Sequence, residues 1–281
     1  MNLSNPNEIK KLLSSEGFSF KKSLGQNFLI DPAVCPAMAA AACDKNTGVL
    51  EIGPGAGVLT YELCKAAKKV VAIELDERLK PILKKSLSDF NNVDIIFGDA
   101  MKLNLHALIA EHFADCEHIC VCANLPYYIT SPIIMLLLES RLPIDSITVM
   151  VQKEAAERLC AKVGSRESGA VTVAVNYYCE GEILFNVPRD SFMPPPKVDS
   201  AVIQLKIRDN PPVTVKDEKR FFSLVKACFA QRRKTLVNTV SSTMGIDRDT
   251  LRGALDKIGL EPTVRGEQLT MKQLAELSDI I

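Results

Sequence analysis

The chain has 281 residues, of which 47% are apolar, and its 34 basic residues balance its 34 acidic residues, so the formal net charge is zero. This length and apolar content allow one large domain with an appendage or two domains, and they exclude wholesale disorder. The charge balance excludes a protein coated with positive charge, so any contact with a nucleic acid must come from local patches.

The sequence contains no evident export or membrane segment. Residues 1–6 lack a basic start followed by an apolar core, and the longest apolar run, 133–138, is far too short to span a bilayer. The nine cysteines follow no disulfide framework, and a chain of this length does not need one. We therefore expect reduced thiols in a cytoplasmic protein with no membrane partner.

The first thirty residues are polar and basic, and an alanine-rich helix is expected over 37–43. From there, apolar strands alternate with helices. Near-continuous apolar strands separated by helices indicate a parallel sheet that is covered on both faces. Strands are predicted at 49–52, 70–75, 93–97, 119–123 and 147–151, and helices at 59–68, 77–87, 132–140 and 154–161.

The pattern then changes. Runs at 171–178, 183–187 and 201–207 read as strands with no room for helices between them, which predicts a hairpin at one sheet edge. The break at 209–212 is the predicted linker, and helices are expected over 219–240, 248–258 and 271–277. The sequence thus predicts an α/β domain over residues 1–209 and a small α-helical domain over 213–281.

A glycine-rich turn follows the first predicted strand. Glycines at 53, 55 and 57 come after Glu51 and precede a helix, as in nucleotide-binding turns. The dinucleotide fingerprint would need its third glycine at position 58, which is Val58. The observed spacing, with an acid before it, instead resembles the S-adenosylmethionine loop of class I methyltransferases.

Two acidic residues end the next strands. Glu74 lies about twenty residues after the turn, where a carboxylate reaches both ribose hydroxyls of a nucleoside. Asp99 ends the third strand and is placed to accept from the cofactor's adenine amino group. A single acid at such a position is more often a solvated strand end. Three strand ends in register with the glycine turn favour cofactor binding in a Rossmann-like class I methyltransferase sheet.

Residues 124–127, Asn-Leu-Pro-Tyr, follow the fourth predicted strand. The N6 amino group of adenine is a poor nucleophile, and two acceptors aimed at its hydrogens would stabilise the charge that develops in the transition state. The Asn124 side chain and the Leu125 carbonyl can supply these acceptors, Pro126 can hold that carbonyl, and Tyr127 can stack on the base. Alone, this motif is equally well a turn after a buried strand; beside the glycine turn it predicts methyl transfer to adenine.

From about residue 22 to 238 the chain resembles the ribosomal RNA adenine N6-dimethyltransferases, in particular the universal small-subunit enzymes. The resemblance is most specific in the proline-rich stretch and in the Gln-Arg-Arg-Lys-Thr run. It is carried by residues 25–29, 51–55, 124–127, 152–154, 192–202 and 229–235.

This resemblance implies S-adenosyl-L-methionine as cofactor and two adjacent adenosines of 16S rRNA, in the 3′-terminal hairpin loop of the small ribosomal subunit, as substrate. Each adenosine would receive two methyl groups, and a monomer suffices. The implied catalytic residues are Asn124, Leu125, Tyr127 and Phe192, of which the two aromatic residues would sandwich the adenine. The implied cofactor contacts are Asn27, Leu29, Gly53, Gly55, Glu74, Asp99 and Asn124. One departure is Ser168, where the family often has an aromatic residue.

A basic run follows the linker. Residues 216–236 carry seven basic side chains against two acidic ones, a local excess of five positive charges. Such a run is usually a solvated helix face, but this excess in a neutral protein favours contact with RNA phosphates. The predicted RNA-binding residues are Lys226, Arg232, Arg233 and Lys234.

A cluster of histidines and cysteines between residues 112 and 122 resembles a metal site. His118 and Cys122 lie on one predicted strand, about 13 Å apart, whereas zinc ligands converge within about 2.3 Å of one point. We therefore expect no metal.

Three other functions stay open at this point. A large-subunit resistance methyltransferase shares the chemistry, although the proline-rich loop and the longer C-terminal domain count against it. A DNA adenine methyltransferase would need a sequence-reading domain. A ribosome-assembly factor that acts mainly by binding is the alternative from a different class.

Overall fold

The computed structural model describes residues 6–15 and 28–281. The chain divides into two compact units, one formed by Met1–Ala156 and Glu182–Ile207, the other by Glu157–Gly181 and Arg208–Ile281. The second unit thus includes residues 157–181, which the sequence-based boundary at residue 209 assigns to the first domain. Asn27, a predicted cofactor contact, lies outside the described residues.

A seven-stranded sheet has the order β4-β3-β2-β5-β6-β9-β7. Its first five strands are mutually parallel and β9 runs antiparallel to β6. The central strands are buried along their length, which is why they read as continuous apolar runs. The strands are β2 Thr47–Ile52, β3 Lys69–Glu74, β4 Val93–Phe97, β5 His118–Asn124, β6 Ser146–Gln152, β7 Cys179–Val187 and β9 Ser200–Ile207.

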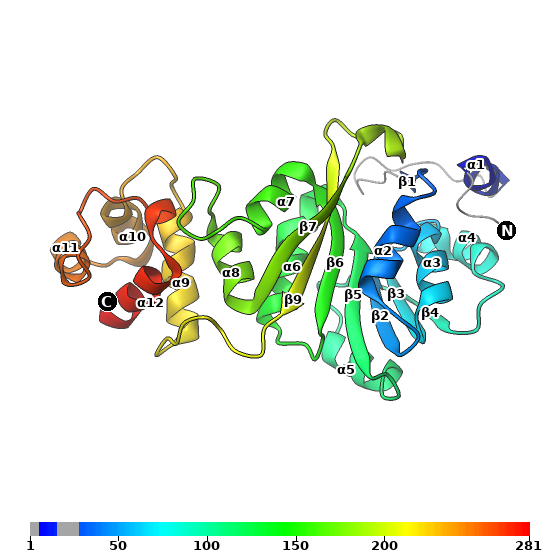
Figure 1. Ribbon diagram of the computed structural model, residues 1–281, viewed down its shortest axis with the longest axis horizontal. Helices are drawn as coiled ribbons and strands as arrows, with labels where there is room; N and C mark the ends of the chain where they lie inside the picture. The colour runs from blue at the N-terminus through cyan, green and yellow to red at the C-terminus, as the bar shows by residue number, and fades with distance from the viewer. Residues whose placement is uncertain (1–5, 16–27) are drawn as a thin grey trace. The chain divides into compact units, whose positions relative to one another are not determined.

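Helices cover this sheet. α2 and α3 pack against each other and onto the strands, and their buried side chains share one cluster with β2, β3, β5 and β6. α6 lies behind the sheet in the view of Figure 1. The helices of this part are α2 Val34–Ala42, α3 Val58–Ala66, α4 Lys80–Ser86, α5 Leu105–His112, α6 Thr130–Glu139 and α7 Lys153–Leu159, with 3₁₀ turns η2 Glu77–Leu79, η3 Tyr127–Ile129 and η4 Arg189–Ser191. Helix α5 was not anticipated from the sequence.

Two short elements flank the sheet. β1 (Phe28–Leu29) and β8 (Phe192–Met193) form an antiparallel ribbon in which Leu29 is paired with Phe192. Helix α1 (Pro6–Ser15) buries Leu12 in a cluster with Leu79 and Leu83.

The strand order reverses direction at β2. β2 is paired with β3 on one side and with β5 on the other, so the chain builds the sheet outward in both directions from this point. Ligands of open α/β sheets bind outside the carboxyl ends of the strands at such a switch point. The pairs Ile52–Ile73 and Glu51–Cys122, continued to the strand ends, place Gly53 level with Glu74 and Asn124.

Residues 171–178 form a helix, α8 (Ala170–Tyr178), and the prediction of a strand there is wrong. The β-branched residues favoured a strand, but packing overrode local propensity, since most of the helix is buried. The buried residues are Thr172, Val173, Ala174, Val175, Tyr177 and Tyr178. The Thr172 hydroxyl accepts from the Gly169 N–H (3.0 Å) and donates to the Arg158 carbonyl (2.7 Å), which fixes the start of the helix. The hairpin prediction holds for β7 and β9, which are neighbours at one edge of the sheet.

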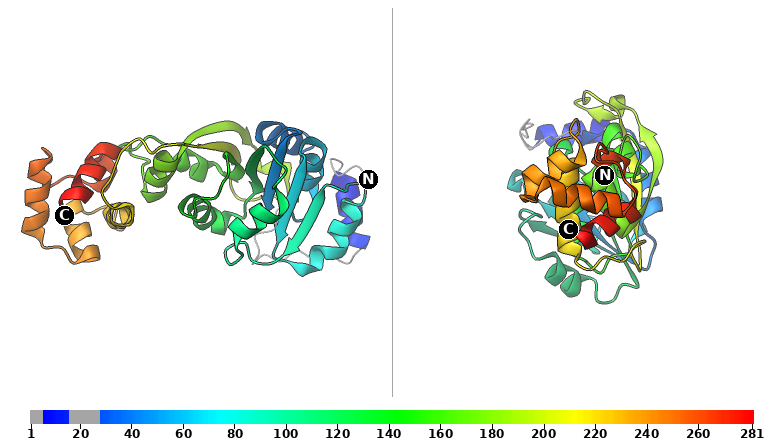
Figure 2. Two further views of the ribbon diagram at one scale, coloured as in Figure 1. Left: turned by 90° about the horizontal axis from the view of Figure 1, so that it is seen from below. Right: turned by 90° about the vertical axis from the view of Figure 1, so that its left-hand side faces the viewer.

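The second unit also contains α9 Glu218–Phe229, α10 Leu236–Met244, α11 Arg248–Lys257 and α12 Met271–Ile280, with the 3₁₀ turn η5 Gly266–Gln268. The right-hand view of Figure 2 looks onto these helices, coloured yellow to red. An aromatic cluster joins α8 to α9, in which Tyr178 stacks on Phe222 with ring centroids 5.3 Å apart. The Glu218 carboxylate accepts hydrogen bonds from Tyr178 (2.7 Å) and Tyr177 (3.3 Å).

The prediction of one helix over 219–240 is wrong, because a turn separates α9 from α10. Phe229 and Leu236 are seven residues apart, a spacing that also fits one face of a continuous helix, so the apolar pattern did not reveal the break. The turn is closed by the Lys234 N–H, which donates to the Gln231 carbonyl (3.0 Å). Arg232, Arg233 and Lys234 therefore lie in this turn, and not on a helix face as predicted, whereas Lys226 lies on α9.

Within the described ranges, no helix is both long and apolar enough to cross a membrane.

Candidate active site

A cavity of about 330 Å³ opens at the carboxyl ends of β2, β3, β4 and β5. Its size is within the range of small-molecule sites. Of the predicted residues, it brings together Leu29, Gly53, Gly55, Glu74, Asp99, Asn124, Leu125, Tyr127 and Phe192.

The glycine turn owes its spacing to backbone conformation. Gly53, Gly55 and Gly57 all have positive φ, at 74°, 58° and 86°, a region that side-chain-bearing residues rarely adopt. A Cβ on Gly57 would also lie 2.8 Å from the Ser86 hydroxyl oxygen. The turn therefore presents bare backbone to the cavity, which lets a ligand approach closely.

Glu74 is tied to this turn. Its Oε2 accepts from the Gly55 N–H (3.1 Å) and its Oε1 from the Asp76 N–H (2.7 Å). Burial raises the pKa of Glu74, while these two hydrogen bonds oppose the shift. Each carboxylate oxygen accepts more than one hydrogen bond, so Glu74 retains acceptor capacity for the two ribose hydroxyls expected there.

Asp99 lies two residues beyond β4 and is partly exposed. Its Oδ1 accepts from the Met101 N–H (3.0 Å), and its Oδ2 is 3.4 Å from the Lys102 ammonium group. These contacts hold the carboxylate at the rim of the cavity on the side of Glu74.

The Asn124 turn is organised around Pro126. Leu125 is buried, and its N–H donates to the Met150 carbonyl of β6 (3.2 Å). The hydrogen bonds that close the turn converge on the Pro126 carbonyl, which accepts from the Ile129 N–H (3.1 Å) and the Thr130 hydroxyl (3.4 Å). Within the described residues the Asn124 amide makes no hydrogen bond, so this group on the cavity wall is available to a ligand.

The two aromatic residues predicted for the adenine differ in exposure. Tyr127 is half-buried, and its hydroxyl lies 2.8 Å from the Ser200 hydroxyl, which fixes the ring. Burial raises the pKa of Tyr127. Phe192 is only 3% exposed and packs in the cluster that contains Leu29 and Met38, so it forms part of the cavity wall and not an open platform.

Sequence reasoning missed three exposed apolar residues at the rim. Leu75, Met101 and Tyr128 are 54%, 41% and 56% exposed and all line the cavity. Leu75 and Met101 lie beside Glu74 and Asp99, where apolar side chains suit the faces of a flat base. Their positions after the two acids were the available signal.

Glu51 is a second omission. The sequence marked it only as the acid before the glycine turn, but it lines the cavity, is 1% exposed and has no partner for Oε2 within the described residues. Burial, and to a smaller extent the neighbouring Glu74, raises the pKa of Glu51 to about 8. A carboxyl group buried in this way is costly to ionise, so Glu51 is protonated at neutral pH in the unliganded protein.

Glu51 should make stability fall as pH rises. The unfolded carboxyl ionises near pH 4.5, whereas the folded group keeps its proton up to about pH 8, so between these values the unfolded chain binds fewer protons. Within this window Glu51 should lower the free energy of unfolding by at most about 1.4 kcal/mol per pH unit.

We expect Glu51→Gln to remove this dependence of stability on pH and to be more stable than the parent at pH 8, as measured by urea unfolding at pH 5, 6.5 and 8. Glu157→Gln, at an exposed position, is the control, and an unchanged slope in Glu51→Gln would contradict the protonated state.

In the second unit, the predicted RNA-binding residues Lys226, Arg232, Arg233 and Lys234 are all exposed. The Arg232 guanidinium donates from Nη2 to the Arg166 carbonyl (2.9 Å). This bond brings the loop at 164–169, whose role the sequence left open, next to the turn that carries Arg232, Arg233 and Lys234, which we call the basic turn. Arg166 is also exposed and adds a cation that sequence reasoning did not include.

No disulfide joins the nine cysteines. Among residues 6–15 and 28–281, no group of three or more His, Cys, Asp or Glu side chains is arranged to hold a metal ion. On β5, His118 is exposed while Cys120 and Cys122 are buried in the sheet.

The sheet order, the glycine turn at the switch point and the acids at the neighbouring strand ends are the fold of class I methyltransferases, the S-adenosylmethionine-dependent class. Comparison with known proteins identifies the family within this class. Residues 17–281 match the family model described as ribosomal RNA adenine dimethylase.

Two relatives and two solved structures illustrate the match. The ribosomal RNA small subunit methyltransferase A of Geobacillus thermodenitrificans is 51% identical over 99% of this chain and 97% of its own length. The protein of the same name in Bacillus licheniformis is 47% identical, over 99% and 96%. A dimethyladenosine transferase from Plasmodium falciparum has a TM-score of 0.69 at 29% identity, covering 89% of this chain and 95% of its own. The 23S rRNA methyltransferase ErmE has a TM-score of 0.65 at 28% identity, over 90% and 98%.

The chain therefore belongs to the ribosomal RNA adenine dimethylase family, and the resemblance drawn from the sequence is confirmed.

Proposed function

We propose that this protein transfers two methyl groups from S-adenosyl-L-methionine to N6 of each of two adjacent adenosines in the 3′-terminal hairpin loop of 16S rRNA, during assembly of the small ribosomal subunit. The observation that carries the proposal is the Asn124 amide, which lacks a partner within the described residues and lines the same cavity as the glycine turn. Together with the Leu125 carbonyl, this amide would provide two acceptors for an amino group beside the proposed cofactor site. Ribosome assembly in bacteria is cytoplasmic, and we propose a cytoplasmic monomer.

The residues of the cavity fit the cofactor. The positive-φ glycines leave room for close approach, and Leu75 and Met101 offer apolar surfaces beside the two acids. The Oε2 of Glu51 has no partner within the described residues, and a cationic ligand would favour the ionised form of this carboxyl group. When bound, S-adenosylmethionine supplies the activated methyl group. Glu74 would hold the ribose and Asp99 the adenine amino group.

Asn124 and Leu125 would act on the substrate amino group. Their oxygens would accept hydrogen bonds from its two N–H groups, draw the nitrogen toward tetrahedral geometry and stabilise the positive charge that appears as the new bond forms. The alkylated nitrogen would then release one proton to water. One hydrogen remains, so one acceptor keeps its partner in the second round. Tyr127, fixed by Ser200, and Phe192 would hold the base that has left its stack.

The small-subunit assignment rests on the relatives. Proteins with that name are 46–51% identical over nearly the whole chain, whereas the large-subunit enzyme is similar at 28% identity. The direct test is tritiated methyl transfer to unmethylated small subunits, large subunits and duplex DNA. Transfer to large subunits or DNA alone would overturn the proposal.

We further propose that the basic turn, with residues 213–281 as an RNA-docking domain, contacts RNA phosphates. The cavity has room to recognise a single adenine base, so the enzyme must select its target adenosines in the rRNA through contacts elsewhere on the protein. Arg232, Arg233 and Lys234 form the densest exposed cationic group of residues 216–236.

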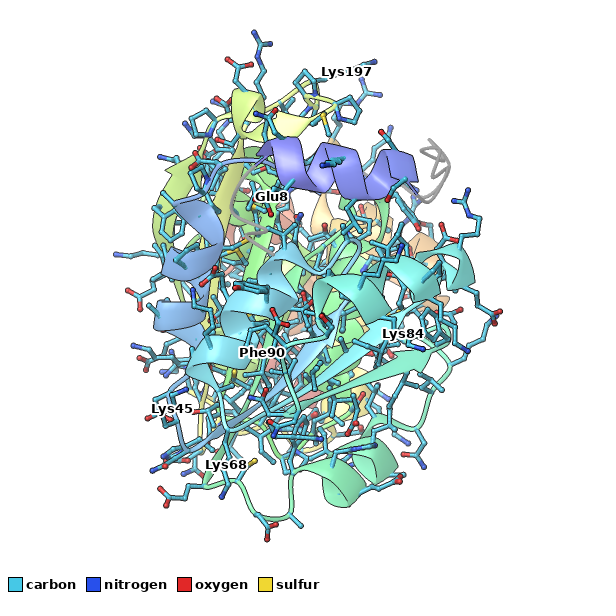
Figure 3. The ribbon with its side chains drawn as sticks, turned by 90° about the vertical axis from the view of Figure 1, so that its right-hand side faces the viewer. Glu8, Lys45, Lys68, Lys84, Phe90 and Lys197 are labelled. Carbon is cyan, nitrogen blue, oxygen red and sulfur yellow. The ribbon has the colours of Figure 1, made fainter. Side chains whose placement is uncertain are left out.

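Replacing Arg232, Arg233 and Lys234 with alanine should weaken binding to small subunits. The slope of log affinity against log salt concentration should fall by roughly 0.7–0.9 for each phosphate contact that is lost. Binding is measured across a salt series. The control replaces the exposed lysines Lys45, Lys68 and Lys84 of the first unit, which are labelled in Figure 3, with alanine. Equal slopes for the two triple variants would show that the turn is only a solvated surface.

A further inference from the structure

Tyr128 is the most exposed of the large apolar residues at the cavity, at 56%, although it directly follows the half-buried Tyr127. Both residues belong to the 3₁₀ turn η3. With three residues per turn, successive side chains point about 120° apart. Tyr127 is turned toward Ser200, and its neighbour is left in water at the rim.

The fold does not account for this exposure. Within the described residues the Tyr128 hydroxyl makes no hydrogen bond, and the ring is part of neither the cluster that contains Leu29 nor the cluster that contains Leu12. Leaving a large aromatic ring in water forgoes the free energy of its burial. Tyr128 shares the rim of the cavity with the exposed Leu75 and Met101, and apolar residues that are exposed together at a cavity mark a binding surface.

Charges near Tyr128 are balanced. The exposed charged residues on the segments next to the Asn124 turn are Lys153, Glu154, Arg189, Asp190, Lys197 and Asp199. The Lys153 N–H donates to the Asp199 carbonyl (3.0 Å), next to the Ser200 that contacts Tyr127, so these segments adjoin. Figure 3 shows Lys197 at the upper edge of the first unit. With three positive and three negative groups among the described residues, this surface offers no excess of positive charge to RNA phosphates.

The exposed Tyr128 ring can instead bind RNA by stacking on a base. Unpaired RNA bases are recognised by stacking on aromatic side chains, and this works for any base because every base has a π-face. The Cα atoms of Tyr127 and Tyr128 are one peptide apart, about 3.8 Å. A nucleotide adjacent to one held at Tyr127 would therefore reach Tyr128.

We propose that Tyr128 is a stacking platform for the nucleobase adjacent to the adenine in the cavity. The proposal rests on the proposed function, because it requires an RNA substrate with a target in a single-stranded loop. When one adenosine leaves its stack, its neighbour loses a partner, and the Tyr128 ring replaces that partner. In a substrate with two adjacent target adenosines, the ring holds one of them while the other is methylated.

The test compares steady-state kinetics of the full-length variants Tyr128→Ala and Tyr128→Phe on unmethylated small subunits. Tyr128→Ala should raise KM for the subunit by roughly five- to a hundredfold, with kcat changed less than KM. The affinity for S-adenosylmethionine should stay within about twofold. Tyr128→Phe, which keeps the ring, should remain close to the parent. Ile183→Ala, at an exposed apolar residue of β7 outside the cavity, is the control.

A salt series separates this contact from the basic turn. The loss in Tyr128→Ala should be the same at every salt concentration, because no phosphate contact is removed. A changed slope, an unchanged KM, a loss of cofactor affinity, or a Tyr128→Phe variant as weak as Tyr128→Ala would each overturn the platform. If the parent protein methylates no small subunits, the proposed function itself fails, and the platform with it.

Discussion

Asn124→Ala should lower turnover on small subunits by about 10²-fold or more, while affinity for S-adenosylmethionine stays within roughly tenfold. The substitution removes one of the two acceptors that act on the amino group, and a lost transition-state hydrogen bond of this kind costs about 10²–10³ in kcat. Single-turnover transfer of tritiated methyl groups isolates the chemical step, and calorimetry gives the cofactor affinity.

The structure indicates that this substitution has few indirect effects on the rest of the site. Within the described residues the Asn124 amide has no hydrogen-bond partner, so its loss leaves no group among these residues unsatisfied. Asn210→Ala, at an exposed position after β9, is the matched control. Turnover close to that of the parent in Asn124→Ala would remove the acceptor mechanism.

Glu74→Ala should weaken cofactor binding by about 10²-fold or more. Hydrogen bonds to a charged group contribute roughly 1.5–3 kcal/mol each, two ribose hydroxyls are expected at this carboxylate, and about 1.4 kcal/mol corresponds to tenfold in affinity. The glycine turn would loosen as well, because Gly55 loses the acceptor of its N–H. Calorimetric titration with S-adenosylmethionine measures the effect.

Two further variants separate direct from indirect loss. Glu74→Gln keeps one side-chain oxygen as an acceptor for the turn but removes the charge, so it should recover part of the affinity. Glu77→Ala, at an exposed residue of η2, should bind the cofactor as the parent does. An unaltered affinity in Glu74→Ala would contradict the placement of the ribose at the end of β3.

Much of the catalytic fold could be predicted because its signals are local and strong. The parallel strands β2, β3, β5 and β6 are largely buried, so they stand out as apolar runs, and the positive φ angles of the turn require the three glycines. The clustering at the cavity also followed, because parallel strands bring their carboxyl ends to one edge of the sheet. Glu74, Asp99 and Asn124, predicted at the ends of successive strands after the glycine turn, therefore line one cavity as expected.

The failures have tertiary causes. The β-branched residues of 171–178 favour a strand, and only packing against α9 makes them helical. The break between α9 and α10 contains neither glycine nor proline. Glu51 and Tyr128 were missed because their roles depend on burial and exposure: one is a carboxyl group sealed in apolar surroundings, the other a ring left in water. A sequence pattern states neither property.

The discontinuous second unit has a consequence for synthesis on the ribosome. α8 leaves the ribosome well before α9, yet Tyr177 and Tyr178 find Glu218, Phe221 and Phe222 only on α9. Until α9 has been made, the nascent chain carries an uncovered aromatic face that is prone to aggregation. A chain that stops near residue 209 would keep this face permanently, so the helical unit cannot be cut away at the linker without leaving an orphaned helix behind.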